Sequence, residues 1–146
     1  MVKATQQASV RWDGDLASGS GVASFKSGAA SDLPVSWASR TNNLAGKTSP
    51  EELLAAAHAS CYAMAFSGAL SRAGTPPQRL SIVADCTFEQ TDSGFKVSRM
   101  VLNVEGEVAG LTQEQFAEAA RAAETGCPVS NALRGNVEIT VNARLV

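Results

Sequence analysis

The sequence has 146 residues, and 12 lysines and arginines against 14 aspartates and glutamates give a net charge of −2. Because there is no basic excess, nucleic acid is excluded as a main partner. Apolar residues make up 45% and charged residues 18%, which excludes a disordered chain. The length suits one domain, which we expect to span residues 1–146.

The number of cysteines indicates the cellular compartment and the role of these residues. Three cysteines are too few for a disulfide-stapled scaffold, and residues 1–12 lack the apolar run of a secretory signal. We therefore expect a cytoplasmic protein, in which cysteines are reduced and are more often chemical than structural.

The first forty residues are expected to form strands. Short segments separated by Gly, Asp and Ser predict an N-terminal meander over residues 4–12, 19–25 and 33–37. No Gly-rich phosphate loop is expected, because Gly19-Ser20-Gly21 precedes a strand and not a helix.

A long helix is predicted next. Residues 53–71 contain no Asp, Glu, Lys or Arg, a length that falls in the range of a membrane span. Soluble-helix signals flank them, however. Ser49 is the expected N-cap, Pro50 the first helical residue, and Glu52 the closing residue of a capping box. Since the segment is also rich in Ala, Ser and Gly, we expect a buried core helix and no membrane partner.

The end of this helix and its surroundings can also be predicted. Arg72 suits the C-terminal dipole, and Gly74 suits the C′ position. A helix that is apolar on every side needs cover on every side, which a short chain can hardly supply. Packing against its symmetry mate in a homodimer is the favoured interpretation, and cover by the chain's own second helix is the alternative.

The remaining elements complete an α+β domain. Strands are predicted over 80–89 and 95–108, joined by the turn 91–94, then a helix over 112–124, a short capped turn after Cys127-Pro128, and a strand over 137–145. Phe116, Ala119, Ala120 and Ala123 form the expected buried face of the second helix.

The residues support a thiol site better than a metal site. His58 and Cys61 lie three residues apart on the long helix, but there is neither a second histidine nor a C-x-x-C pair, so no metal is expected. A Cys61–His58 nucleophilic pair is conceivable, although a lone histidine in an apolar helix more often serves packing. Cys127 is the predicted N-cap before Pro128, where amides stabilise a thiolate, whereas burial should raise the pKa of Cys61. Cys86 is expected to pack as a small hydrophobe.

Two cysteine motifs carry a resemblance to a known family. Residues 49–61, SPEELLAAAHASC, and residues 126–130, GCPVS, resemble the OsmC/Ohr family of thiol-dependent hydroperoxide reductases. Ala57-His58-Ala59 and the Cys-Pro-Val-Ser run look more like the OsmC branch, whereas Asn131-Ala132 looks more like the Ohr branch. The resemblance implies an OsmC-like α+β fold, with antiparallel strands around a long buried central helix and a second helix, in an intertwined homodimer.

The resemblance also implies a mechanism. Cys61 would be the peroxidatic cysteine, attacking the peroxide as a thiolate, and Cys127 would resolve the sulfenic acid to a disulfide. Arg40 would be the cation near the thiolate, and Glu51 would orient it through a bidentate pair. No metal, haem or flavin cofactor is implied, and the reductant would be a dithiol or a lipoylated protein.

Helix geometry adds a condition to this mechanism. Glu51 and Cys61 are ten residues apart, or about 15 Å along a straight helix, which one glutamate cannot bridge. The set of side chains is therefore expected at a dimer interface, and one chain holding the whole set would contradict this. Two other functions remain open: a non-catalytic dimeric binding protein for apolar ligands with redox-sensitive cysteines, and general thiol–disulfide exchange.

Overall fold

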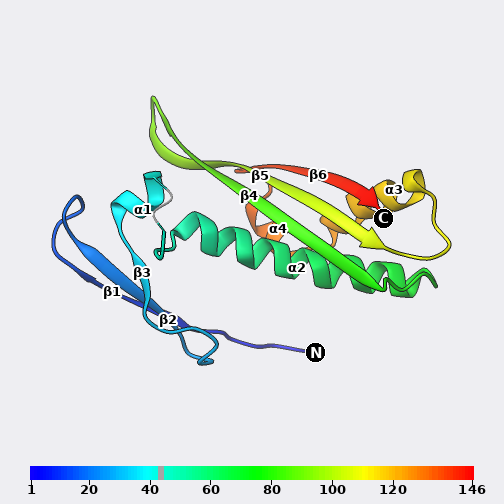
Figure 1. The fold of residues 1–146 in the computed structure, drawn as a ribbon, viewed down its shortest axis with the longest axis horizontal. Helices are drawn as coiled ribbons and strands as arrows, with labels where there is room; N and C mark the ends of the chain where they lie inside the picture. The colour runs from blue at the N-terminus through cyan, green and yellow to red at the C-terminus, as the bar shows by residue number, and fades with distance from the viewer. Residues whose placement is uncertain (43–44) are drawn as a thin grey trace. The chain divides into compact units, whose positions relative to one another are not determined.

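The computed structural model describes residues 1–42 and 45–146 (Figure 1). The chain divides into two compact units, Met1–Leu53 and Leu54–Val146, each of which is described by itself. Its mixture of helices with two three-stranded sheets confirms the predicted α+β class. A single domain over residues 1–146 stays a prediction.

The first unit contains the predicted meander. Strands β1 (Ala8–Asp13), β2 (Ser20–Phe25) and β3 (Leu33–Val35) pair in that order, and both pairings are antiparallel. The turn between β1 and β2 is held by Asp15, whose carboxylate accepts hydrogen bonds from the N–H groups of Ala17 and Ser18. Strand β1 begins four residues later than its predicted start.

A short helix replaces the end of the third predicted strand. Helix α1 (Trp37–Asn42) begins where residues 33–37 were expected to be extended, so that part of the prediction is wrong. The reason is local: Ser36 Oγ accepts the N–H of Ser39 at 3.1 Å, which is an N-cap interaction. The Ser39 hydroxyl in turn donates to the carbonyl of Thr48 at 2.8 Å and ties this helix to the segment before the next one.

Helix α2 (Pro50–Arg72) begins at the predicted residue. Ser49 Oγ accepts the N–H of Glu52 at 3.1 Å, which confirms the N-cap. The Glu52 carboxylate, however, accepts the hydroxyl of Thr48 at 2.6 Å, so the reciprocal half of the predicted capping box is replaced by a neighbouring hydroxyl donor.

The end of α2 is a Schellman motif, with Gly74 in the predicted position. The Gly74 N–H donates to the carbonyl of Ser71 at 3.1 Å, and the Thr75 N–H donates to the carbonyl of Leu70 at 3.0 Å. Gly74 has a φ of +81°, which is why glycine suits this position.

The second unit is built on a mixed sheet. Strands β4 (Arg79–Thr91) and β5 (Gly94–Glu107) form the predicted hairpin, and β6 (Glu138–Leu145) pairs with β5 in parallel. The expectation of only antiparallel strands is therefore wrong for β6. The chain passes through α3 (Gln113–Thr125) and α4 (Pro128–Leu133) between β5 and β6, and such a crossover brings the next strand back in the same direction.

The core of this unit lies between the sheet and the two longer helices. Every fourth residue of α2 from residue 58 is buried: His58, Tyr62, Phe66 and Leu70. Phe66 lies 5.3 Å from the ring of Phe116 on α3, and the Tyr62 hydroxyl donates to the carbonyl of Ala120 at 2.7 Å. This stripe positions the middle of α2 and therefore also positions Cys61.

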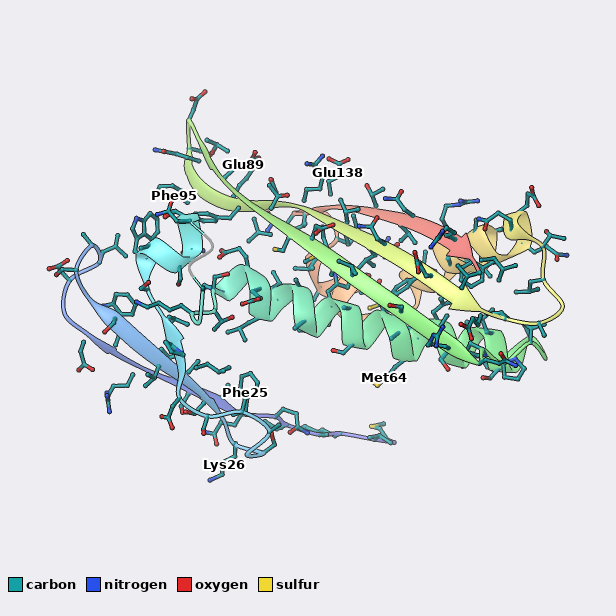
Figure 2. All side chains as sticks on the ribbon, viewed as in Figure 1. Phe25, Lys26, Met64, Glu89, Phe95 and Glu138 are labelled. Atoms are coloured by element: carbon teal, nitrogen blue, oxygen red, sulfur yellow. The ribbon has the colours of Figure 1, made fainter. Side chains whose placement is uncertain are left out.

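Within the second unit, α2 buries one face and exposes residues on another. Met64 is 70% exposed, and Figure 2 shows it at the lower edge of α2. By length and composition alone α2 could cross a membrane, with 22% of its apolar window buried. Its buried stripe packs on a sheet and a second helix, however, as the core helix of a soluble protein does. The exposure of Met64 agrees with the expectation that a short chain can hardly cover this helix on every side.

Candidate functional site

Two cysteines from distant parts of the sequence meet where α4 begins beside α2. Cys61 lies half-buried in the middle of α2, and Cys127 is the N-cap of α4 with an exposed fraction of 0%. Neither cysteine is in a disulfide, and the thiol of Cys127 lies near enough to Cys61 to raise the pKa of its thiol. The structure thus brings together the two cysteines to which the resemblance assigns a peroxidatic and a resolving role.

The sulfur of Cys61 lies in a mixed electrostatic environment. Burial is the largest cause that raises the pKa of the Cys61 thiol, as the sequence predicts. The main-chain N–H of Val129 donates a hydrogen bond to this sulfur and lowers the pKa, and the thiol of Cys127 raises it. The local environment therefore favours the protonated thiol at neutral pH.

The amide at the start of α4 assists a different cysteine from the one expected from local sequence. Cys127 is the N-cap and Pro128 the first helical residue, as predicted, but the Cys127 side chain makes no capping hydrogen bond. The free N–H of Val129 points instead to Cys61. Sequence reasoning missed Val129, although Pro128 had already indicated free amides there.

His58 bonds to α4 and not to the sulfur. Its Nε2 lies 2.7 Å from the Ser130 hydroxyl, and both residues are fully buried. Nδ1 has no hydrogen-bond partner among the residues that the structure describes. Burial lowers the pKa of His58 more than the charge of Glu124 raises it, so the ring is neutral at pH 7. This geometry agrees with the packing role of His58 and does not support a Cys61–His58 nucleophilic pair.

Arg40 and Glu51 form an ion pair within the first unit. Both Nε and Nη2 of Arg40 lie 2.8 Å from Oε1 of Glu51, and the exposed fractions of the two side chains are 31% and 8%. The pair differs from the expected bidentate arrangement, because both donors converge on one oxygen. Glu51 Oε2 is buried and has no hydrogen-bond partner among the described residues. The guanidinium also lies 5.9 Å from the ring of Trp37, within cation–π range.

The predicted site residues therefore form two pairs, one in each unit. Arg40 and Glu51 are paired in the first unit, and Cys61 and Cys127 are paired in the second. Cys86 belongs to neither pair. It is half-buried on β4 and packs against the hydrophobic core, as predicted.

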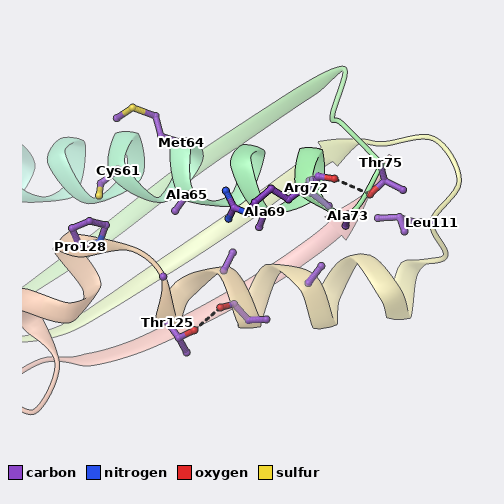
Figure 3. A pocket seen from close by; sticks show the side chains of 15 residues that line it. Cys61, Met64, Ala65, Ala69, Arg72, Ala73, Thr75, Leu111, Thr125 and Pro128 are labelled. Carbon is purple, nitrogen blue, oxygen red and sulfur yellow. Dashed lines mark hydrogen bonds between the residues drawn. The ribbon is translucent and has the colours of Figure 1, made fainter. Parts of the chain in front are cut away.

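An apolar cavity of about 750 Å³ adjoins the sulfur of Cys61 between α2 and α3 (Figure 3). Alanines from both helices form much of its wall, with Met64 at its edge and Pro128 of α4 beside the cysteine. Sequence reasoning did not identify this cavity, because it requires two helices that are separated by a hairpin to lie side by side. No group of three or more His, Cys, Asp or Glu residues that could hold a metal ion is found in residues 1–42 and 45–146.

Comparisons with known proteins find a matching family, similar sequences and similar structures. The model of the family described as OsmC-like protein matches residues 42–142. Peroxiredoxin OsmC of Escherichia coli is 37% identical over 134 residues, which cover 92% of each chain. Organic hydroperoxide resistance protein OhrB of Bacillus subtilis is 32% identical over 104 residues, covering 66% of this chain and 70% of that one. The crystal structure of OhrB superposes with a TM-score of 0.74 at 26% identity, covering 94% of this chain and 98% of that chain.

Proposed function

Because this chain belongs to the OsmC-like protein family, we propose that it is a cysteine-based peroxidase that reduces hydroperoxides at Cys61. One observation carries this proposal: half-buried Cys61 lines an apolar cavity and lies beside the fully buried thiol of Cys127. A peroxide that enters the cavity meets Cys61, and the second thiol is in place for the next step.

The first step is nucleophilic attack. The Cys61 thiolate attacks one oxygen of the peroxide, an S–O bond forms and the O–O bond breaks. The other oxygen leaves with the electron pair, takes a proton and becomes an alcohol, or water when the substrate is hydrogen peroxide. The N–H of Val129 stabilises the negative charge on the sulfur before the attack.

The second step uses Cys127. Its sulfur attacks the sulfenic acid of Cys61, an S–S bond forms, the S–O bond breaks, and water leaves. An external dithiol, either a small molecule or a lipoylated protein, then reduces the disulfide by thiol–disulfide exchange and is itself oxidised. The burial of Cys127 supports its resolving role, because a fully buried thiol is shielded from external peroxide.

The working unit is proposed to be a homodimer. Within α2, Glu51 and Cys61 are ten residues apart, so Glu51 and the arginine that it holds would serve the sulfur of the partner subunit. The charge of Arg40 would then lower the pKa that burial raises. The uncovered face of α2 around Met64 supplies apolar surface for this association. The proposed location is the cytoplasm, where external thiols keep the cycle running.

The cavity supports organic hydroperoxides as the preferred substrates. An alkyl or aryl group gains free energy by leaving water for an apolar wall, and hydrogen peroxide has no such group. The same cavity would also suit a non-catalytic binding protein for apolar ligands, so the decisive experiment must measure chemistry.

The test is peroxide consumption with dithiothreitol as reductant, together with mass spectrometry after a brief exposure to one equivalent of cumene hydroperoxide. We expect Cys61→Ser to abolish turnover, Cys127→Ser to retain sulfenic acid at Cys61, and Cys86→Ser to behave as the unmodified protein. Wild-type protein should lose two hydrogens as a Cys61–Cys127 disulfide forms. Turnover that survives in Cys61→Ser would rule out Cys61 as the nucleophile, and a wild-type protein without turnover would favour the binding protein.

A further inference from the structure

Among the described residues that line the cavity beside Cys61, one is charged, Arg72. The other described lining residues, among them Ala65, Ala69 and Ala123, are apolar or uncharged. Among the described residues, no hydrogen bond or ion pair engages the guanidinium of Arg72. An apolar wall that carries one unpaired cation has the chemistry to bind an amphipathic anion.

The orientation of Arg72 places its charge in the cavity. Its side chain runs back along α2 toward Ala69, as Figure 3 shows. A Cβ atom at Gly68 would lie 3.2 Å from Nη1 of Arg72, so the guanidinium rests over this glycine. An arginine that served only the helix dipole would extend toward the carbonyl groups at the C-terminal end of α2.

The hydroxyl groups of the cavity are already engaged. Thr125 donates to the carbonyl of Ala122 at 2.7 Å, and Thr75 lies 3.4 Å from the carbonyl of Leu70 (Figure 3). Their protons are directed to the main chain, so Arg72 is the cavity's donor for a carboxylate.

We propose that Arg72 is a specificity-determining residue that binds the carboxylate of hydroperoxy carboxylic acids while Cys61 reacts with the hydroperoxide group. This inference rests on the proposed function, because it assigns a substrate class to the same cavity. Gly68 follows Cys61 by seven residues, so the carboxylate and the peroxide would be separated by roughly 10 Å along α2. The apolar part of the substrate would lie against the alanine wall between them.

The test compares a long-chain hydroperoxy acid with its methyl ester, which has the same chain and peroxide but no charge. We expect wild-type protein to prefer the acid in kcat/KM by about tenfold, the size of one charge-assisted hydrogen bond. Arg72→Met should bring the ratio of acid to ester close to one, and Arg72→Lys should retain part of it. Added salt should lower the wild-type ratio, because the guanidinium is exposed enough for screening.

Two further variants separate recognition from folding. Gly68→Ala would push the flexible guanidinium aside by only a few tenths of an ångström, so this variant should keep most of the ratio. Arg144→Met removes an arginine that is paired with Glu105 on the sheet and should leave the ratio unchanged. A ratio that is the same in wild-type protein and in Arg72→Met would overturn the proposal.

A binding measurement keeps this inference distinct from the proposed function. Calorimetric titration with the non-peroxidic parent acid should show weaker binding to Arg72→Met than to wild-type protein, whether or not peroxide is turned over. Absence of turnover with both acid and ester would refute the peroxidase. Equal binding of the parent acid to the two proteins would refute the role of Arg72.

Discussion

The main-chain N–H of Val129 donates a hydrogen bond to the sulfur of Cys61, although the two residues are 68 positions apart. Val129 is the second residue of α4, where helix N–H groups have no partner within the helix. The proposed nucleophile therefore receives a hydrogen bond from the N-terminus of α4, whereas its own position in the middle of α2 offers no free helix N–H.

Removal of this N–H should make Cys61 less reactive. Val129→Pro deletes the donor at a first-turn position that tolerates proline, whereas Val129→Ala retains it. In a Cys127→Ser, Cys86→Ser background, iodoacetamide should alkylate Cys61 about tenfold more slowly at pH 7 in the proline variant, because the pKa of the thiol rises further. Equal rates in the proline and alanine variants, with equal helix content by circular dichroism, would show that the amide has no such effect.

Loss of Arg40 should move the pH dependence of Cys61 to higher pH. The thiolate is the reactive form and burial raises the pKa of the thiol, so reactivity increases with pH up to that pKa. In the proposed dimer the cation of Arg40 opposes this shift. Arg40→Met should therefore lower the alkylation rate at pH 7 by about tenfold or more and move the increase to higher pH.

A matched arginine provides the control for this experiment. Arg11 is exposed, lies in the same unit and is paired with Asp13, so Arg11→Met should preserve the pH profile of Cys61. Dilution of wild-type protein below its dimer dissociation constant should reproduce the effect of Arg40→Met. If alkylation of the diluted protein keeps its wild-type profile, the cation does not come from the partner subunit.

The His58–Ser130 contact should contribute to stability. Ser130→Ala leaves both ring nitrogens of a buried histidine without a partner and should lower the free energy of unfolding by about 1–3 kcal/mol in urea titrations. Ser71→Ala is the control, since that exposed hydroxyl bonds to a helix carbonyl. In a double-mutant cycle, His58→Leu with Ser130→Ala should cost less than the sum of the single changes. Additive costs would mean that the contact contributes nothing.

Gly106 of β5 makes room for Phe116 of α3. A Cβ atom at this position would lie 2.6 Å from Cε2 of Phe116, whose fully buried ring cannot move aside. Gly106→Ala should therefore lower the free energy of unfolding by about 1–3 kcal/mol through overpacking. Gly126→Ala is the matched control, because its Cβ would meet nothing closer than 3.6 Å. Thermal denaturation that gives the two variants the same midpoint would contradict this account.

Sequence patterns were sufficient where structure depends on neighbouring residues. The N-cap Ser49, the first residue Pro50 and the C′ residue Gly74 of α2 are all confirmed, because capping depends on groups within one helical turn. The β4–β5 hairpin is confirmed for the same reason. Helix α1 was missed although Ser36 and Ser39 carry its capping signal, because the preceding apolar residues favoured a strand.

These local patterns could not predict how distant segments of the chain pack together. The sequence by itself determined the α+β class, the long helix with Cys61, and the placement of Cys127 at the N-cap before Pro128. Only the tertiary structure directed the α4 amide to Cys61, turned β6 parallel to β5, and placed Arg72 in an apolar cavity. Capping and periodicity are local properties of a chain, whereas a hydrogen bond or cavity wall shared by two helices depends on how the whole core packs.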